Sequence, residues 1–177
     1  DIPLNGELVT AKGEVTLRNN SLFIKPLDST LKNLSGKFSF INGDLQSEPL
    51  TASWFNQPLN VDFSTKEGAK AYQVAVNLNG NWQPAKTSVL PEAVNEALSG
   101  SVAWDGKVDI DLPYHAGATY NVEMNGDLNN VSSHLPSPLA KPAGEPLAVN
   151  VKVDGNLNSF ELTGQAGADN HFNSRWL

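Results

Sequence analysis

Apolar and polar residues alternate with a period of two along most of this chain, and this pattern constrains the fold more than any other feature. Between residues 71 and 78, Tyr72, Val74, Val76 and Leu78 are separated by polar or small residues. Successive side chains of a β-strand point to opposite faces, so such a run predicts a strand with one apolar and one polar face. The same alternation recurs in runs that contain Val15 and Leu17, Phe38 and Phe40, Leu59, Val61 and Phe63, Val108, Ile110 and Leu112, Tyr120, Val122 and Met124, and Leu147, Val149, Val151 and Val153. The sequence therefore predicts an almost all-β chain.

Short polar segments with glycine accompany these runs and predict tight hairpins. Asn, Asp and Gly accept the positive φ angles that two-residue hairpin turns require. The segments are Asn42-Gly43-Asp44, Asn79-Gly80-Asn81, Asp105-Gly106, Asn125-Gly126-Asp127 and Asp154-Gly155-Asn156. Continuous apolar runs separated by helices, which are typical of a parallel sheet, are absent. We therefore expect antiparallel strands that are joined mostly in sequence order.

One short helix is predicted at residues 91–98. Pro91 suits the first turn, Val94 and Leu98 lie four residues apart, and Ser99-Gly100 ends the segment. Farther along the chain, a proline-rich stretch predicts a loop or an edge crossover, because proline cannot donate to the hydrogen-bond ladder of a central strand. Its prolines are Pro136, Pro138, Pro142 and Pro146.

The chain divides at the end of the predicted helix into two halves, residues 1–98 and 99–177, whose sequences resemble each other weakly. Leu34-Ser35-Gly36 opens one set of strands and Leu98-Ser99-Gly100 opens the next. This spacing is longer than that of most short solenoid repeats. The sequence predicts one globular unit, or one section of a larger protein, with two repeat-like halves.

Composition and charge exclude several classes of function. The length of 177 residues and the hydrophobic content of 40% are sufficient for a core, whereas the net charge of -7 argues against nucleic-acid binding. The absence of Cys removes disulfides, thiolate zinc sites and thiol nucleophiles, and it favours a bacterial envelope protein. Neither a signal peptide nor an apolar run of about 18 residues is present. Because the chain begins at Asp1, we expect a processed or excised piece whose membrane anchor lies outside it.

The residues that could carry catalysis or bind a metal form no convincing motif. The three histidines, His115, His134 and His171, are far apart and lack metal-binding spacing. Asp109 and Asp111 could pair as carboxylates or as half of a calcium site, but their alternation with apolar residues indicates the solvated face of a strand. Neither a nucleophile elbow nor a phosphate loop occurs. We expect a protein that is not an enzyme and needs no cofactor or metal.

The four tryptophans suggest an alternative function. Trp54, Trp82, Trp104 and Trp176 could stack on sugar rings, as in a secreted carbohydrate-binding module with a β-sandwich fold. Their scattered positions beside polar residues near strand ends fit core or rim positions better.

Several short motifs follow one another in a definite order along the chain. The first half shows Leu34-Ser35-Gly36, Pro49-Leu50-Thr51-Ala52 and Gln57-Pro58-Leu59, and the second half shows Leu98-Ser99-Gly100, Trp104-Asp105-Gly106, Leu112-Pro113, Gly126-Asp127-Leu128 and the proline-rich stretch. The order of these motifs resembles the AsmA-like, TamB-related family of repeating β-groove proteins. The resemblance implies a strongly curved antiparallel sheet with an apolar concave face. It also implies a section of a bridge-like protein that passes phospholipid between the inner and outer membranes of a Gram-negative cell, within a periplasmic protein anchored in the inner membrane. Its implied partners are phospholipid, adjoining repeats of the same polypeptide, and membranes reached through regions outside this chain.

The apolar stripes are the candidate lining of such a groove. A lipid that crosses water needs continuous apolar cover, because each exposed methylene costs about 0.8 kcal/mol. The candidate residues are Phe38, Phe40, Leu59, Val61, Phe63, Tyr72, Val74, Val76, Leu78, Val108, Ile110, Tyr120, Val122, Met124, Val149, Val151 and Val153. The same stripes could instead face a second sheet in a closed sandwich, and alternation alone does not separate an open groove from a closed core.

Overall fold

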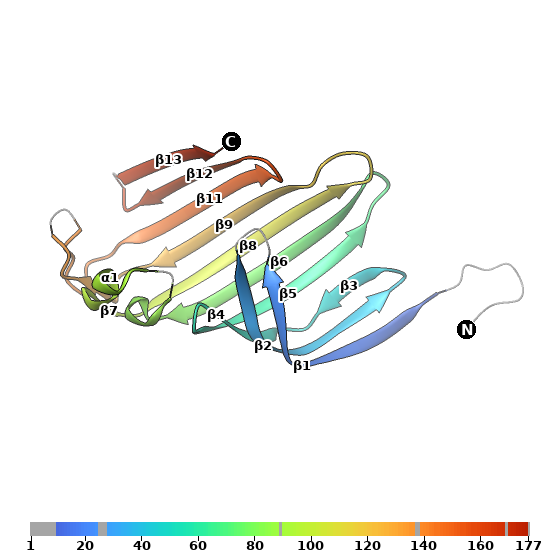
Figure 1. Cartoon of the computed structure of the whole chain (residues 1–177), viewed down its shortest axis with the longest axis horizontal. Helices are drawn as coiled ribbons and strands as arrows, with labels where there is room; N and C mark the ends of the chain where they lie inside the picture. The colour runs from blue at the N-terminus through green and yellow to red at the C-terminus, as the bar shows by residue number, and fades with distance from the viewer. Residues whose placement is uncertain (1–9, 25–27, 89, 137–138, 169, 177) are drawn as a thin grey trace, which may run out of the picture.

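A long antiparallel sheet forms most of the molecule in the computed structural model, which describes residues 10–24, 28–88, 90–136, 139–168 and 170–176 (Figure 1). The strands are β1 (Lys12–Ile24), β2 (Ser29–Ile41), β3 (Asp44–Ser47), β4 (Leu50–Trp54), β5 (Gln57–Glu67), β6 (Ala71–Trp82), β7 (Leu98–Gly100), β8 (Val102–Pro113), β9 (Thr119–Asp127), β10 (Val131–Ser133), β11 (Ala148–Asn156), β12 (Phe160–Ala166) and β13 (Asn170–Trp176). In the described residues the main sheet has eleven strands in the order β1-β2-β3-β5-β6-β8-β9-β11-β12-β13, and β4 pairs with both β2 and β5. Antiparallel pairing in sequence order is confirmed.

The connection between β6 and β8 leaves the sheet and returns to it. It holds the turn of 3-10 helix η2 (Pro84–Lys86), the helix α1 (Glu92–Glu96) and β7, which pairs with β10 in a separate two-stranded sheet. The helix is shorter than predicted. Leu98, which the prediction placed at its end, instead begins β7. Strand β6 pairs with β8 from Ala71 and Pro113 to Trp82 and Val102, so the main sheet continues without a break across this excursion.

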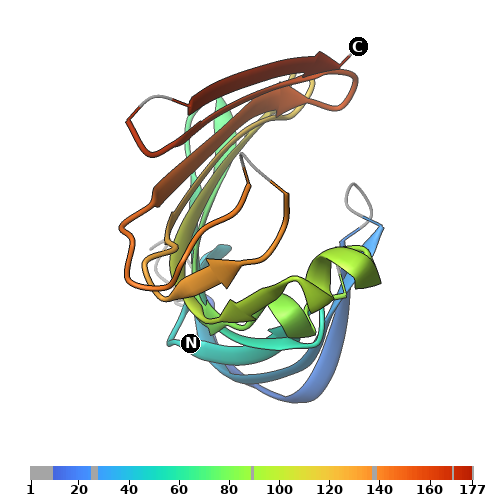
Figure 2. The ribbon, with the colours of Figure 1, turned by 90° about the vertical axis from the view of Figure 1, so that its left-hand side faces the viewer.

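The sheet is strongly bent, with β1 and β2 at one end of the curve and β12 and β13 at the other (Figure 2). The pairing of β1 with β2 contains register shifts around Asn20, and Asn19 and Asn33 have φ angles of 53° and 56°. Such bulges increase the local twist of a sheet. The predicted all-β curved sheet with one short helix is therefore confirmed, and the described strands do not form the two facing sheets of a sandwich.

The predicted hairpin turns were mostly wrong. Asn42 and Gly43, with φ angles of 51° and 98°, do form the turn between β2 and β3. The other predicted turns lie inside strands, because Gly80, Gly106, Gly126 and Gly155 belong to β6, β8, β9 and β11 respectively. The hairpin between β4 and β5 is made instead by Phe55 and Asn56, which have φ angles of 49° and 62°.

The proline-rich stretch lies between β10 and β11, as the sequence predicted for a loop. An isolated bridge joins Ser133 to Lys141, and the Lys141 ammonium donates to the carbonyl oxygen of Val131 at 2.9 Å. Pro138 lies outside the described residues. Among the described residues, no helix has the length and apolar character needed to span a membrane.

Candidate functional site: the apolar inner face of the sheet

The strand register collects the apolar stripes on one face of the sheet. Residues that oppose each other directly in an antiparallel pair point to the same face. Four rows of such residues run from β5 or β6 to β13, and no charged residue occupies them. The rows are Gly80, Trp104, Gly126, Val149, Ala166 and Asn170; Val61, Leu78, Gly106, Met124, Val151, Gly164 and Phe172; Phe63, Val76, Val108, Val122, Val153, Leu162 and Ser174; and Thr65, Val74, Ile110, Tyr120, Gly155, Phe160 and Trp176. We call this surface the apolar face.

The apolar face lies on the inside of the bend. The rings of Phe38 on β2 and Phe63 on β5 are 5.7 Å apart, although strand β3 lies between them: Phe38 pairs with Ser47, and the Phe63 N–H donates to the Ser47 hydroxyl at 2.8 Å. Backbones two strands apart are separated by about 9.5 Å in a flat sheet, so these side chains converge. Trp54 on β4 and Trp82 on β6 converge similarly across β5, with ring centres 6.4 Å apart. Convergence of side chains across an intervening strand marks the concave side.

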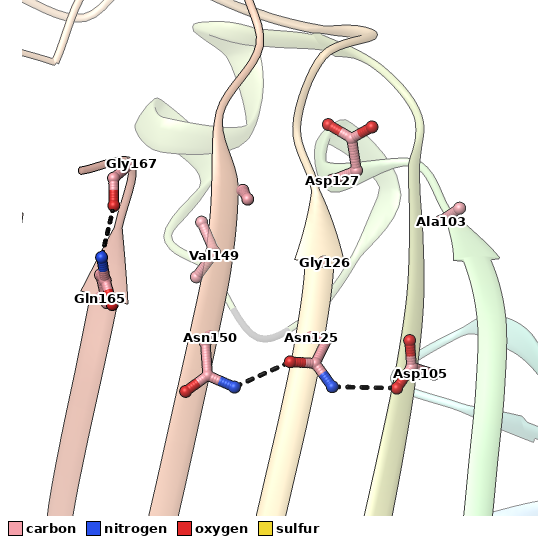
Figure 3. Close-up of a pocket in the computed structure, with 10 residues that line it drawn as sticks. Ala103, Asp105, Asn125, Gly126, Asp127, Val149, Asn150, Gln165 and Gly167 are labelled. Carbon is pink, nitrogen blue, oxygen red and sulfur yellow. Dashed lines mark hydrogen bonds between the residues drawn. The ribbon is translucent and has the colours of Figure 1, made fainter.

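The opposite face is polar and its side chains bind one another. Asn150 donates to Asn125 at 2.7 Å and Asn125 donates to Asp105 at 3.1 Å, so that the three residues bridge neighbouring strands (Figure 3). A shallow depression of about 430 Å³ lies over this ladder, and Asp127 and Gln165 also line it. Because the ladder residues already use their polar groups on each other, this depression is a weaker candidate for function than the apolar face.

The predicted lining residues point to the same side of the sheet as the apolar face, although Tyr72 pairs with Glu67 outside its four rows, and their burial differs. Leu59 and Val61 are buried, at 3% and 6% exposure, whereas all of the others are partly exposed. Phe38 and Phe40 join the face through β3, where Ser47 and Leu45 oppose them. The structure therefore brings the predicted residues together, and it leaves most of them partly exposed.

Burial divides the apolar face into two parts. In the first part, which we call the closed half, the core consists of residues from β2, β4 and β5 together with one from β8: Leu31, Leu34, Leu50, Ala52, Leu59, Val61 and Trp104. The second part, which we call the open half, is formed by β9, β11, β12 and β13, and none of the described residues in these strands is buried. The open half also adds Phe160, Leu162, Phe172 and Trp176 to the face, which the sequence prediction missed because glycine and polar residues interrupt the alternation there.

Three of the four tryptophans belong to one aromatic cluster at the end of the closed half. Trp54 stacks on Phe55 with ring centres 4.6 Å apart, and Trp82 meets Trp104 edge to face at 4.7 Å. The indole N–H of Trp54 donates to the Ser29 hydroxyl at 2.5 Å, and that of Trp82 donates to the Pro58 carbonyl at 2.8 Å. Rings packed against each other in this way cannot form a flat platform for sugars, so the structure does not favour the carbohydrate-binding alternative.

The strand ends far from α1 are polar at the rim. The Tyr72 hydroxyl lies 2.6 Å from the Thr65 hydroxyl and donates to the Gly43 carbonyl at 2.9 Å. The Tyr114 hydroxyl donates to the Gly68 carbonyl at 3.1 Å. Partial desolvation, and then the nearby Glu67 carboxylate, raise the pKa of Tyr114. These hydroxyls fix the strand ends rather than reaching over the apolar face.

The carboxylates that were considered for catalysis or metal binding lie on the polar face. Asp109 pairs with Lys107 at 2.8 Å, and Asp111 accepts a hydrogen bond from Gln73 at 3.0 Å. Within the described ranges, no three His, Cys, Asp or Glu side chains gather into a group that could hold a metal ion. The arrangement of these residues is that of a solvated strand face.

Comparison with known proteins gives one family and one close relative. The family model described as "YhdP protein" matches residues 1–177. The chain is 97% identical over its whole length to the Escherichia coli K12 protein named "Intermembrane phospholipid transporter YhdP", and it spans 14% of the length of that protein. No solved structure matches the chain.

Proposed function

Because this chain belongs to the YhdP protein family, we propose that it is one section of a bridge that carries phospholipid between the two membranes of a Gram-negative envelope. In this proposal the acyl chains lie on the apolar face and the headgroups stay in water. The section contributes a surface rather than a reaction, so transport along it is passive and needs no cofactor.

The absence of charge from four partly exposed rows is the observation that carries this proposal. A charged side chain in such a row would have to be desolvated each time an acyl chain passed over it, and desolvation of an unpaired charge costs several kcal/mol. Each methylene that leaves water for the face gains about 0.8 kcal/mol. The row of partly exposed residues from Phe63 on β5 to Leu162 on β12 offers this gain without an electrostatic barrier.

The surroundings of the section follow from the same proposal. Its relative is named an intermembrane transporter, which supports a location in the envelope, across the periplasm. The chain spans 14% of that relative, so adjoining repeats of the same polypeptide would continue the face and regions outside this chain would contact the membranes. Anchoring in the inner membrane and support of the outer-membrane barrier belong to this proposal.

Photo-crosslinking in the full-length protein tests the proposal. A crosslinking amino acid at Val151, on the apolar face of β11, should capture phospholipid, whereas one at Lys152, the next residue and on the polar face, should not. Val76→Asp and Val151→Asp should each abolish lipid passage, while Thr163→Asp on the polar face of β12 should leave it unchanged. Equal capture at the two positions, or no capture at Val151, would show that the apolar face does not carry lipid.

A further inference from the structure

Glycines interrupt the apolar face at positions where the backbone does not require them. Gly80, Gly106, Gly126, Gly155 and Gly164 all lie within strands, in the rows that form the face. None of them has a positive φ angle. Glycine weakens a strand interior and supplies no apolar side chain, so these residues need another physical reason.

Close approach of aromatic rings supplies that reason at Gly155 and Gly164 in the open half, whereas a Cβ atom at Gly126 would make only ordinary contacts. A Cβ atom at Gly155 would lie 2.6 Å from the hydroxyl oxygen of Tyr120, 2.7 Å from its ring and 2.8 Å from the Cβ atom of Phe160. A Cβ atom at Gly164 would collide with the outer edge of the Phe172 ring. Tyr120 and Phe172 are the direct partners of these glycines on the neighbouring strands, so each ring lies across a glycine on the strand beside it.

In the closed half, the same kind of contact between a glycine and an aromatic ring contributes to packing of the core. Trp104 and Trp82 approach Gly80, where a Cβ atom would lie 2.9 and 3.0 Å from their indole nitrogens. There the Trp104 ring belongs to the core and is 8% exposed. Phe172, in contrast, keeps 45% of its surface exposed. Packing alone therefore explains the glycine in the closed half, but in the open half the Phe172 ring gains little burial from its position over Gly164.

We propose that Gly155 and Gly164 keep the open half clear for acyl chains. Each glycine lets an aromatic ring lie along the sheet, whereas a Cβ atom would lift the ring into the space above Val151 and Val153 that a lipid tail occupies. This inference rests on the proposed lipid transport, and it names the residues that keep the space above this part of the sheet free for lipid.

The test is lipid capture by a photo-crosslinker at Val153 in the full-length protein. Val153 lies on the same strand face as Gly155 and opposes Leu162, so it is near both glycines but is the partner of neither. Gly155→Ala and Gly164→Ala should each lose most of the lipid captured by the otherwise unchanged protein. Gly117→Ala is the matched control, since a Cβ atom there meets nothing within 4 Å, and it should capture lipid normally.

A second variant tests whether a loss of lipid capture comes from displacement of the ring or from damage to the strand. In Gly164→Ala combined with Phe172→Ala the ring is gone, so lipid capture should return. Undiminished capture in Gly164→Ala would overturn the inference, and so would a folded double variant that still fails to capture lipid. If the unchanged protein captures no lipid at Val153, the proposed transport fails and this inference fails with it, whereas normal capture with no effect of alanine refutes the inference alone.

Discussion

The closed and open halves carry the same alternation of side chains but differ in what happens to their apolar face. In the closed half, Leu50 is 1% exposed and forms the centre of a continuous core. In the open half, Val151 and Leu162 lie in the same uncharged rows and remain partly exposed. The strand pattern thus decides which side chains share a face, whereas the curvature of the sheet decides whether that face becomes a core or a surface.

The two halves accordingly have different physical roles. Bulges between β1 and β2, and the sharing of β4 by β2 and β5, make side chains converge and exclude water in the closed half. Burial of apolar surface stabilises a fold by about 25 cal/mol per Å². The closed half therefore stabilises the bend, and the open half leaves its apolar side chains at least partly exposed.

Truncation of one leucine in each half should give the largest difference in stability between the two halves. Leu50→Ala should lower the free energy of unfolding by about 2–5 kcal/mol, because it leaves a cavity in the core. Leu162→Ala makes the same chemical change on the partly exposed face of β12, and its loss should be about 1 kcal/mol or less. Urea unfolding of the purified chain, followed by tryptophan fluorescence, measures both values. Equal losses would mean that the open half is as well packed as the closed half.

Loss of one buried hydrogen bond in the closed half should have a smaller effect. Ser29 is 8% exposed and its hydroxyl accepts the indole N–H of Trp54. Ser29→Ala should cost about 1–3 kcal/mol, because the partly buried indole N–H loses its partner. Ser174→Ala removes a hydroxyl from the apolar face of β13 and should change the unfolding midpoint little. If both variants behaved alike in the same urea titration, the aromatic cluster would not anchor the closed half.

The alternation allowed the faces of the strands to be predicted, but the turns required information that is not local. Asn79-Gly80 and Asp154-Gly155 have the composition of a hairpin turn, yet each lies in a strand with its polar residue on the outer face and its glycine on the inner face. What distinguishes them is a ring from another strand, Trp104 or Tyr120, and no neighbouring residue indicates this. The real turn at Phe55 and Asn56 lacks glycine, so its composition did not predict a turn.

The apolar face was predictable as a set of residues, whereas its division into two halves was not. All of the predicted lining residues share one face, because alternation fixes the direction of each side chain. Burial of Leu59 and partial exposure of Val149 depend on the bend, which arises from bulges and from pairing between distant strands. The resemblance to the groove family is confirmed by the family match, and the two repeat-like halves of the sequence stay a prediction.

The polar faces of the two halves should contribute equally little to stability. Their ion pairs test this, and removal of these pairs should have the smallest effect on unfolding. Glu14 pairs with Lys37 at 2.8 Å in the first half of the sheet, and Glu123 pairs with Lys152 at 3.4 Å in the open half. The hydrogen bond from Lys37 to Glu14, with the charge of Glu14, raises the pKa of Lys37. Any stability from this exposed pair is therefore kept small by solvent screening, is present below the ordinary pKa of lysine and is lost as the pH rises through the higher folded value.

Neutral substitution of either acidic partner should leave the unfolding midpoint unchanged. Both pairs are about half exposed, so water and salt screen them. Glu14→Gln should lower the pKa of Lys37 toward its ordinary value, which an NMR titration of the side chain measures, without a change in urea unfolding at pH 7. Glu123→Gln should likewise leave urea unfolding unchanged. A clear loss of stability in only one of the two variants would show that the outer face also distinguishes the halves, and the difference could then no longer be assigned to burial on the inner face alone.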